Sequence, residues 1–185
     1  HYAMDVEKAV DPGPAYLVTN AMQQVVKAGT ASAMKSKLSP DLNIAGKTGT
    51  TDDYRDSWFA GFSGDRLTVI WLGRDDNKPT GLSGGSGALR VWMDLMSDLK
   101  LEPLDAPPPA GVEQVLVDPR NGLRLGQGCR RGQSIPFLAG SEPQGFASCS
   151  PPAKRVAKPS RGGGDKSAGD GEDGGMSDFF QRLME

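Results

Sequence analysis

A lysine and three threonines in the stretch Gly46-Lys47-Thr48-Gly49-Thr50-Thr51 stand just before two apolar runs that favour β-strands. The runs, 57–63 and 67–73, are rich in aromatic and β-branched residues and are joined by Gly64-Asp65-Arg66, which predicts an antiparallel hairpin. A further strand over 44–51 would place a cation, hydroxyls and backbone beside a groove for an extended ligand. A side chain at Gly49 would hold such a ligand away from the strand.

The Lys-Thr pair does not belong to a phosphate-binding loop. That motif needs a glycine where this chain has Asp41, and it needs a helix directly after Thr48. No helical pattern follows Thr48. The sequence therefore excludes a nucleotide-binding loop at this position.

Two helices accompany the strands. A helical stripe of apolar residues runs from the prolines at 12 and 14 to Gly29, and a second begins near Ala88. The expected core positions are Leu17, Val18, Ala21, Met22, Val25 and Val26 in the first and Leu89, Trp92, Leu95, Met96 and Leu99 in the second. We therefore predict an α+β fold, with an antiparallel sheet flanked by helices, over residues 1–102.

The C-terminal part is expected to consist of three segments. Residues 103–111 contain three consecutive prolines and predict a stiff linker. Residues 112–150 form a small module with a strand over 112–117 and a pairing segment over 123–125. Residues 151–185 are predicted to be a disordered tail. Its last residues indicate either a frayed end or a short docking helix for a partner or membrane surface, with one apolar face formed by Met176, Phe179, Phe180, Leu183 and Met184.

The module holds the two cysteines of the chain, Cys129 and Cys149, around an apolar segment too small for a core. A disulfide between them would contribute roughly 3 kcal/mol in the chain-entropy estimate. Two free thiols are the alternative.

Composition excludes several classes of function. The net charge is −2 and the basic residues form no face with interleaved aromatic residues, so we expect no nucleic-acid partner. The one histidine is His1, which predicts neither a Ser/His/Asp triad nor a zinc site. We expect no metal and no cofactor, and lysine-assisted serine chemistry is the acyl-transfer option that remains.

The ordered motifs resemble the end of the transpeptidase domain of penicillin-binding proteins. They are Lys47-Thr48-Gly49-Thr50-Thr51, Asp56-Ser57-Trp58-Phe59-Ala60-Gly61 and Trp71-Leu72-Gly73-Arg74-Asp75. Segments 76–80 and 84–88, with the late cysteine pair, are most similar to the class A, bifunctional type, and within it to the 1B branch. The resemblance covers residues 11 to about 150.

The resemblance implies a D,D-transpeptidase that attacks D-alanyl-D-alanine stem peptides of peptidoglycan and is acylated by β-lactams. Lys47 and Thr50 would be catalytic, Lys47 through its charge and Thr50 through its backbone N–H. Thr48, Gly49 and Thr50 would bind substrate. The family also implies a glycosyltransferase domain, cell-wall synthesis partners, and a place on the periplasmic side of the inner membrane, with the membrane anchor outside this sequence.

The family's other two motifs are not found. Ser32-Ala33-Met34-Lys35 and Ser97-Asp98-Leu99-Lys100 match Ser-x-x-Lys but stand in the wrong order or spacing, and no Ser-x-Asn string occurs. We therefore expect a C-terminal fragment that is inactive alone. The alternatives are a D,D-carboxypeptidase or serine β-lactamase relative, and a non-catalytic interaction fragment.

Overall fold

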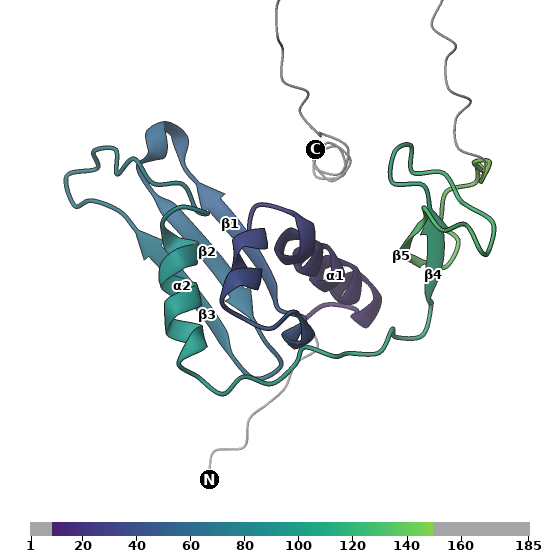
Figure 1. Ribbon diagram of the computed structural model, residues 1–185, viewed down its shortest axis with the longest axis horizontal. Helices are drawn as coiled ribbons and strands as arrows, with labels where there is room; N and C mark the ends of the chain where they lie inside the picture. The colour runs from purple at the N-terminus through teal and green to yellow at the C-terminus, as the bar shows by residue number, and fades with distance from the viewer. Residues whose placement is uncertain (1–8, 150–185) are drawn as a thin grey trace, which may run out of the picture. The chain divides into compact units, whose positions relative to one another are not determined.

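The computed structural model describes residues 9–149, and the chain divides into two compact units between Val112 and Glu113 (Figure 1). The predicted tail and its short helix lie outside the described residues. Helices and antiparallel strands are both present, which confirms the predicted α+β class.

The first unit is built on a three-stranded antiparallel sheet in the order β1-β2-β3 (Figure 1). Its strands are β1 (Ala45–Thr50), β2 (Ser57–Phe62) and β3 (Leu67–Leu72). These are the three strands that the sequence predicts, each within one or two residues. Because β1 stands at the edge of this sheet, one side of its backbone faces away from β2.

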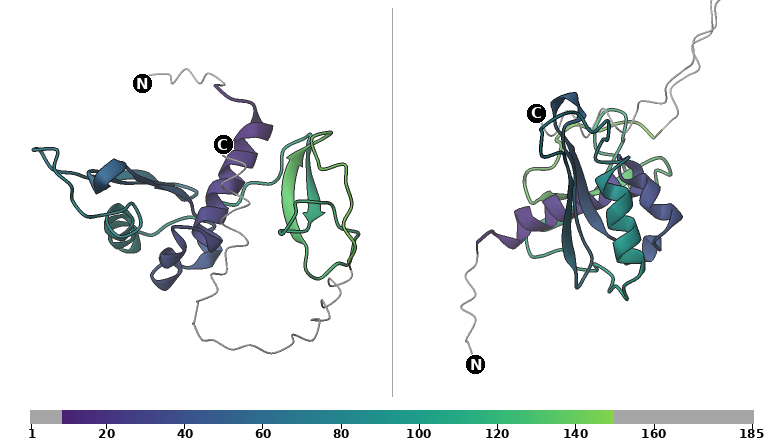
Figure 2. Two further views of the ribbon diagram at one scale, coloured as in Figure 1. Left: turned by 90° about the horizontal axis from the view of Figure 1, so that it is seen from above. Right: turned by 90° about the vertical axis from the view of Figure 1, so that its left-hand side faces the viewer.

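Helix α2 (Ala88–Ser97) covers one face of the sheet (Figures 1 and 2). Phe59 and Trp92 are fully buried between them, with ring centroids 5.2 Å apart in an edge-to-face arrangement. Leu95 and Leu99, however, are 46% and 42% exposed, so their predicted places in the core are wrong. The helix turns Trp92, Met93 and Met96 to the sheet, which leaves Leu95 on the outer side.

Helix α1 (Pro12–Ala28) packs against β1 and ends where Gly29 donates its N–H to the carbonyl of Val25. Only Val26 of its predicted stripe is fully buried, and Val18 is 60% exposed. Gln23 secures the helix by donating to the carbonyl of Asn43 across 2.9 Å. The short 3-10 helices Ser32–Ser36 and Pro40–Leu42 then lead into β1.

The other face of the sheet carries exposed apolar side chains within the described residues. These are Trp58, Leu67, Val69 and Trp71. They alternate along β2 and β3 with the residues that face α2, as the period of a strand requires.

A second sheet pairs β4 (Val112–Val117), which begins at the boundary between the units, with β5 (Gln133–Leu138) in the second unit. The sequence predicts β4 but not β5. Arg124 forms the expected bridge with Val117. The strand β5 was missed because Pro136 stands inside it. A proline donates no backbone hydrogen bond, and it is tolerated here because each strand of a two-stranded sheet is an edge strand.

Candidate functional site

The side chains of β1 alternate between the two faces of the sheet. Thr48 lies opposite Phe59 and Thr50 opposite Ser57, so both hydroxyls are on the face that α2 covers. Lys47 and Gly49 lie on the other face. The predicted site residues therefore share one strand but divide between its two sides.

The register also determines where the backbone groups of β1 point. Thr51 donates its N–H to the carbonyl of Asp56 across 3.2 Å. The direction alternates along a strand, so the backbone N–H and C=O groups of every second residue before Thr51 also point toward β2. The N–H and C=O groups of Thr48 and Thr50 therefore point away from β2, at the edge of the sheet.

Lys47 reaches the same edge. Its ammonium group donates to the carbonyl oxygen of Thr48 across 2.9 Å, and the side chain is exposed. The edge of β1 thus combines a cation with the outward N–H of Thr50. This combination can hold negative charge next to an extended ligand.

Each hydroxyl of β1 has a partner from another part of the chain. The hydroxyls of Thr30 and Thr48 are hydrogen-bonded at 2.7 Å, and the backbone N–H of Gly84 donates to the hydroxyl of Thr50 at 2.9 Å. Sequence reasoning missed both partners. The only signal was the Gly/Ser-rich composition of 83–87, which indicates a close backbone approach without naming its target.

Gly84 lies directly over the paired residues Gly49 and Trp58. A Cβ atom at Gly84 would come within 2.6 Å of the Trp58 carbonyl oxygen and 2.7 Å of the Gly49 carbonyl oxygen. Only glycine allows this approach. Glycine is also favoured at position 49 for a steric reason, since a Cβ atom there would lie 3.1 Å from the Cβ atom of Trp58.

The two Ser-x-x-Lys strings lie in a short 3-10 helix and at the end of α2. Ser32 begins a 3-10 helix and is exposed, as is Lys35. Ser97 is the last residue of α2 and donates its hydroxyl to the carbonyl of Asp94 at 2.9 Å. Neither serine is paired with its lysine in the hydrogen bonds of the described residues.

Asp56 is a structural residue beside the site. Its carboxylate accepts the indole N–H of Trp71 at 2.9 Å and the hydroxyl of Thr51 at 3.1 Å. Through these bonds Asp56 connects Thr51, directly after β1, with Trp71 on β3. The side chain thereby supports the end of β1.

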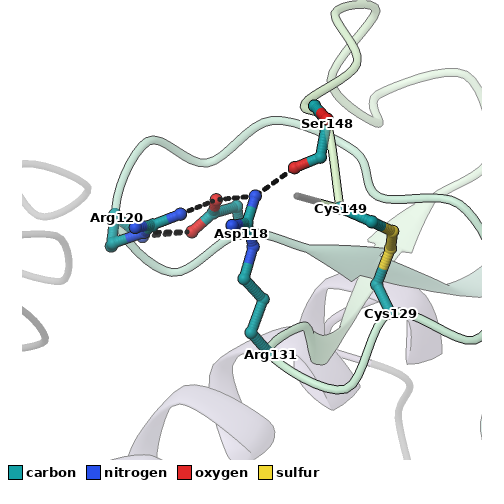
Figure 3. Close-up of a disulfide and its surroundings, with 6 residues drawn as sticks. All are labelled: Asp118, Arg120, Cys129, Arg131, Ser148 and Cys149. Carbon is teal, nitrogen blue, oxygen red and sulfur yellow. Dashed lines mark hydrogen bonds and ion pairs between the residues drawn. A yellow bond between two sulfur atoms is a disulfide. The ribbon is translucent and has the colours of Figure 1, made fainter. Parts of the chain in front are cut away.

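The second unit holds a buried carboxylate beside a disulfide (Figure 3). Cys129 and Cys149 are bonded, with Cα atoms 5.6 Å apart. Asp118 is 1% exposed; Arg120 donates to its two oxygens at 3.1 and 2.9 Å, and Arg131 lies 3.3 Å away. Arg131 also donates to the carbonyl of Ser148, so this arginine links the carboxylate to the residue before Cys149.

The charge of Asp118 is strongly favoured. The hydrogen bonds from the Arg120 side chain lower the pKa of Asp118 from 3.8 to about 2, against the opposing effect of burial. Asp118 is therefore ionised at neutral pH, and its ion pairs with Arg120 and Arg131 organise the module.

Residues 9–149, which the structure describes, contain neither a metal-binding cluster nor a membrane-spanning helix. That part of the chain contains no group of three or more His, Cys, Asp or Glu side chains placed to hold a metal ion. None of its helices has the length and apolar character needed to cross a bilayer.

Residues 3–90 match the family model of the penicillin-binding protein transpeptidase domain. The chain is 50% identical over 107 residues to penicillin-binding protein 1B of Vibrio cholerae, covering 58% of this chain and 14% of that protein. It is 43% identical over 112 residues to penicillin-binding protein 1B of Escherichia coli, covering 60% and 13%. The chain thus spans about one seventh of the length of these relatives.

A solved structure shows the same fold. The crystal structure of penicillin-binding protein 1A from Haemophilus influenzae superposes with a TM-score of 0.63 at 28% identity, covering 73% of this chain and 21% of that one. The resemblance found in the sequence motifs is therefore confirmed by the family model, by relatives and by a structure.

Proposed function

We propose that β1 is the third motif of a D,D-transpeptidase site, because residues 3–90 match the model of the penicillin-binding protein transpeptidase domain. The serine nucleophile with its lysine, and the Ser-x-Asn motif, would be supplied by other parts of a longer class A protein. The direction of the Thr50 N–H, beside the ammonium group of Lys47, is the observation that carries the proposal.

The reaction is acyl transfer from a D-alanyl-D-alanine stem peptide. The serine oxygen attacks the carbonyl of the penultimate residue, the carbonyl oxygen becomes an oxyanion, and the terminal D-alanine leaves with a proton on its amine. The amine of a second stem peptide then attacks the acyl-serine and forms the cross-link. A β-lactam enters the same first step, in which its ring nitrogen is the leaving group.

Each residue of β1 has a role in that step. The N–H of Thr50 donates to the oxyanion, together with a second donor at the nucleophile. The ammonium of Lys47 stabilises the growing negative charge and binds the serine of the second motif. The hydroxyls of Thr48 and Thr50 bind the terminal carboxylate of the substrate, and Gly49 allows its backbone to approach.

The rest of the proposal concerns the whole protein. We place it on the periplasmic side of the bacterial inner membrane, with its anchor and a glycosyltransferase domain outside this sequence, and with cell-wall synthesis proteins as partners. The disulfide between Cys129 and Cys149 supports this compartment, because disulfides persist in oxidising surroundings.

The test is acylation by a fluorescent penicillin in a longer protein that joins this chain to the family's first two motifs. Lys47→Ala should slow the second-order acylation rate roughly 100-fold or more, and Lys47→Arg should recover only part of it. The chain by itself should not be labelled at Ser32 or Ser97. Parental acylation by Lys47→Ala, with an unchanged melting temperature, would remove Lys47 from the site.

A further inference from the structure

The two hydroxyls of β1 differ from ordinary exposed threonines because each is already bound from the side of the strand that faces α2. Thr50 accepts the N–H of Gly84 at 2.9 Å, and Thr48 is bonded to the hydroxyl of Thr30 at 2.7 Å. Thr30 follows α1 and Gly84 precedes α2, so neither partner belongs to the Lys-Thr-Gly strand.

The bond at Thr50 has one possible direction. A backbone N–H only donates, so it occupies an acceptor lone pair of the Thr50 hydroxyl and leaves the hydroxyl proton unused by that bond. The side chain of Thr50 is exposed. Its proton is therefore available to an acceptor that arrives from solvent.

The bond between Thr30 and Thr48 can run either way until a ligand is present. A carboxylate only accepts hydrogen bonds, so Thr48 must donate its single proton to a carboxylate that binds there. Thr30 must then be the donor to Thr48. The bonds run in sequence from Thr30 to Thr48 to the carboxylate, and each strengthens the next.

The loop that carries Gly84 is held rigidly. The buried hydroxyl of Ser57 donates to the carbonyl of Ser83 at 2.8 Å, and the carbonyl of Gly84 accepts the N–H of Leu89 at 2.9 Å. The contact of Gly84 with the Gly49–Trp58 pair leaves no space for displacement toward the sheet. The N–H that binds Thr50 is thus directed by the core of the unit.

We propose that Thr30 and Gly84 are positioning residues that direct the hydroxyl protons of Thr48 and Thr50 toward the carboxylate of the substrate. The inference rests on the proposed function and deepens it. Neither residue touches the substrate: Thr30 acts through Thr48, and Gly84 acts through Thr50. Their contribution appears only with ligands that carry the carboxylate.

The experiment compares acylation by benzylpenicillin with acylation by its methyl ester, which lacks the negative charge, in the longer protein described above. Thr30→Val keeps the shape and removes the hydroxyl. It should slow acylation by the acid roughly five- to tenfold and leave the rate with the ester within about twofold. Thr30→Ser should restore the parental ratio of the two rates.

A second variant tests the other arm. Gly84→Ala should move the loop away from β1 and produce the same selective loss with the acid. If Gly84→Ala fails to fold, the comparison of Thr30→Val with Thr30→Ser still tests the proposal. An equal loss with acid and ester, or no loss with the acid, overturns the proposal.

Failure of the inference can be separated from failure of the proposed function. If Lys47→Ala acylates normally, β1 is not the site and the function falls with the inference. If Lys47→Ala is impaired while Thr30→Val is parental with both ligands, only the inference is wrong.

Discussion

The hydroxyl of Ser57 accepts the backbone N–H of Ala88 across 2.9 Å and thereby caps α2 from a strand 31 residues away in the sequence. The residue at the usual cap position, Gly87, has no side chain to do this. Because Ser57 also donates to the carbonyl of Ser83, one fully buried hydroxyl joins β2, the loop and α2.

Ser57→Ala should lower the free energy of unfolding of the first unit by about 1 to 2 kcal/mol, because it leaves the buried N–H of Ala88 without its partner. It also removes one of the donors to the carbonyl of Ser83, which keeps the N–H of Gly87 at 2.9 Å. Urea unfolding followed by tryptophan fluorescence measures this unit alone, since Trp58, Trp71 and Trp92 all belong to it. Ser32→Ala, at an exposed serine, is the matched control and should be nearly silent. Equal stability of the two variants would refute the capping role.

Thr48→Val should slow acylation by benzylpenicillin roughly tenfold in the longer protein, because the shape survives but a hydrogen bond to a charged group is lost. Thr48→Ser keeps the hydroxyl and should stay within about twofold of the parent. The measurement is the second-order rate constant, with thermal melts as the folding control. Similar rates for valine and serine would show that the hydroxyl does not contact the carboxylate.

Asp118 should make the second unit sensitive to acid. Its pKa is lowered from 3.8 to about 2 by Arg120, so its contribution to stability is complete above about pH 4 and disappears as the pH falls through 2. Hydrogen exchange of amides 112–138, corrected for intrinsic rates, should show decreasing protection between these values.

Asp118→Asn should remove this pH dependence and lower protection at pH 7 by roughly 2 kcal/mol, the scale of hydrogen bonds to a charged group. Asp76→Asn is the control. The pKa of Asp76 is also lowered to about 2, mainly by the hydrogen bonds from the Arg74 side chain. Its carboxylate, however, lies in an exposed loop of the first unit. Identical pH profiles for Asp118→Asn and the parent would contradict the assignment.

Neither Cys129 nor Cys149 should react in a thiol titration of the denatured, unreduced protein, and two thiols should appear after reduction. Reduction should increase hydrogen exchange over residues 112–149, because the 20-residue separation of the cysteines is no longer closed by a covalent bond. Tryptophan fluorescence of the first unit should not change. Two reactive thiols before reduction would exclude the bridge in the isolated protein.

Local sequence patterns predicted the elements better than their environments. The strands and both helices follow from periods of two and 3.6 residues, which are properties of neighbouring residues. Burial depends on what packs against an element. The apolar pattern therefore predicted helix α2 correctly but wrongly placed Leu95 in the core, where the structure has it exposed. The strand β5 was missed because Pro136 interrupts its strand pattern, and because 15 residues without regular structure separate it from its partner β4.

The chemistry at the site was a property of the sequence alone, since Lys47, Thr48 and Thr50 carry their charge and hydroxyls wherever the chain places them. The order of the motifs around them was enough to predict the resemblance to penicillin-binding proteins that the comparisons confirm. Only the tertiary structure decided that the N–H of Thr50 faces outward, because a strand's hydrogen-bonding direction depends on its register with a partner. The contacts of Thr30 and Gly84 with β1 likewise arise from the path of the chain around the sheet, which no short-range pattern records.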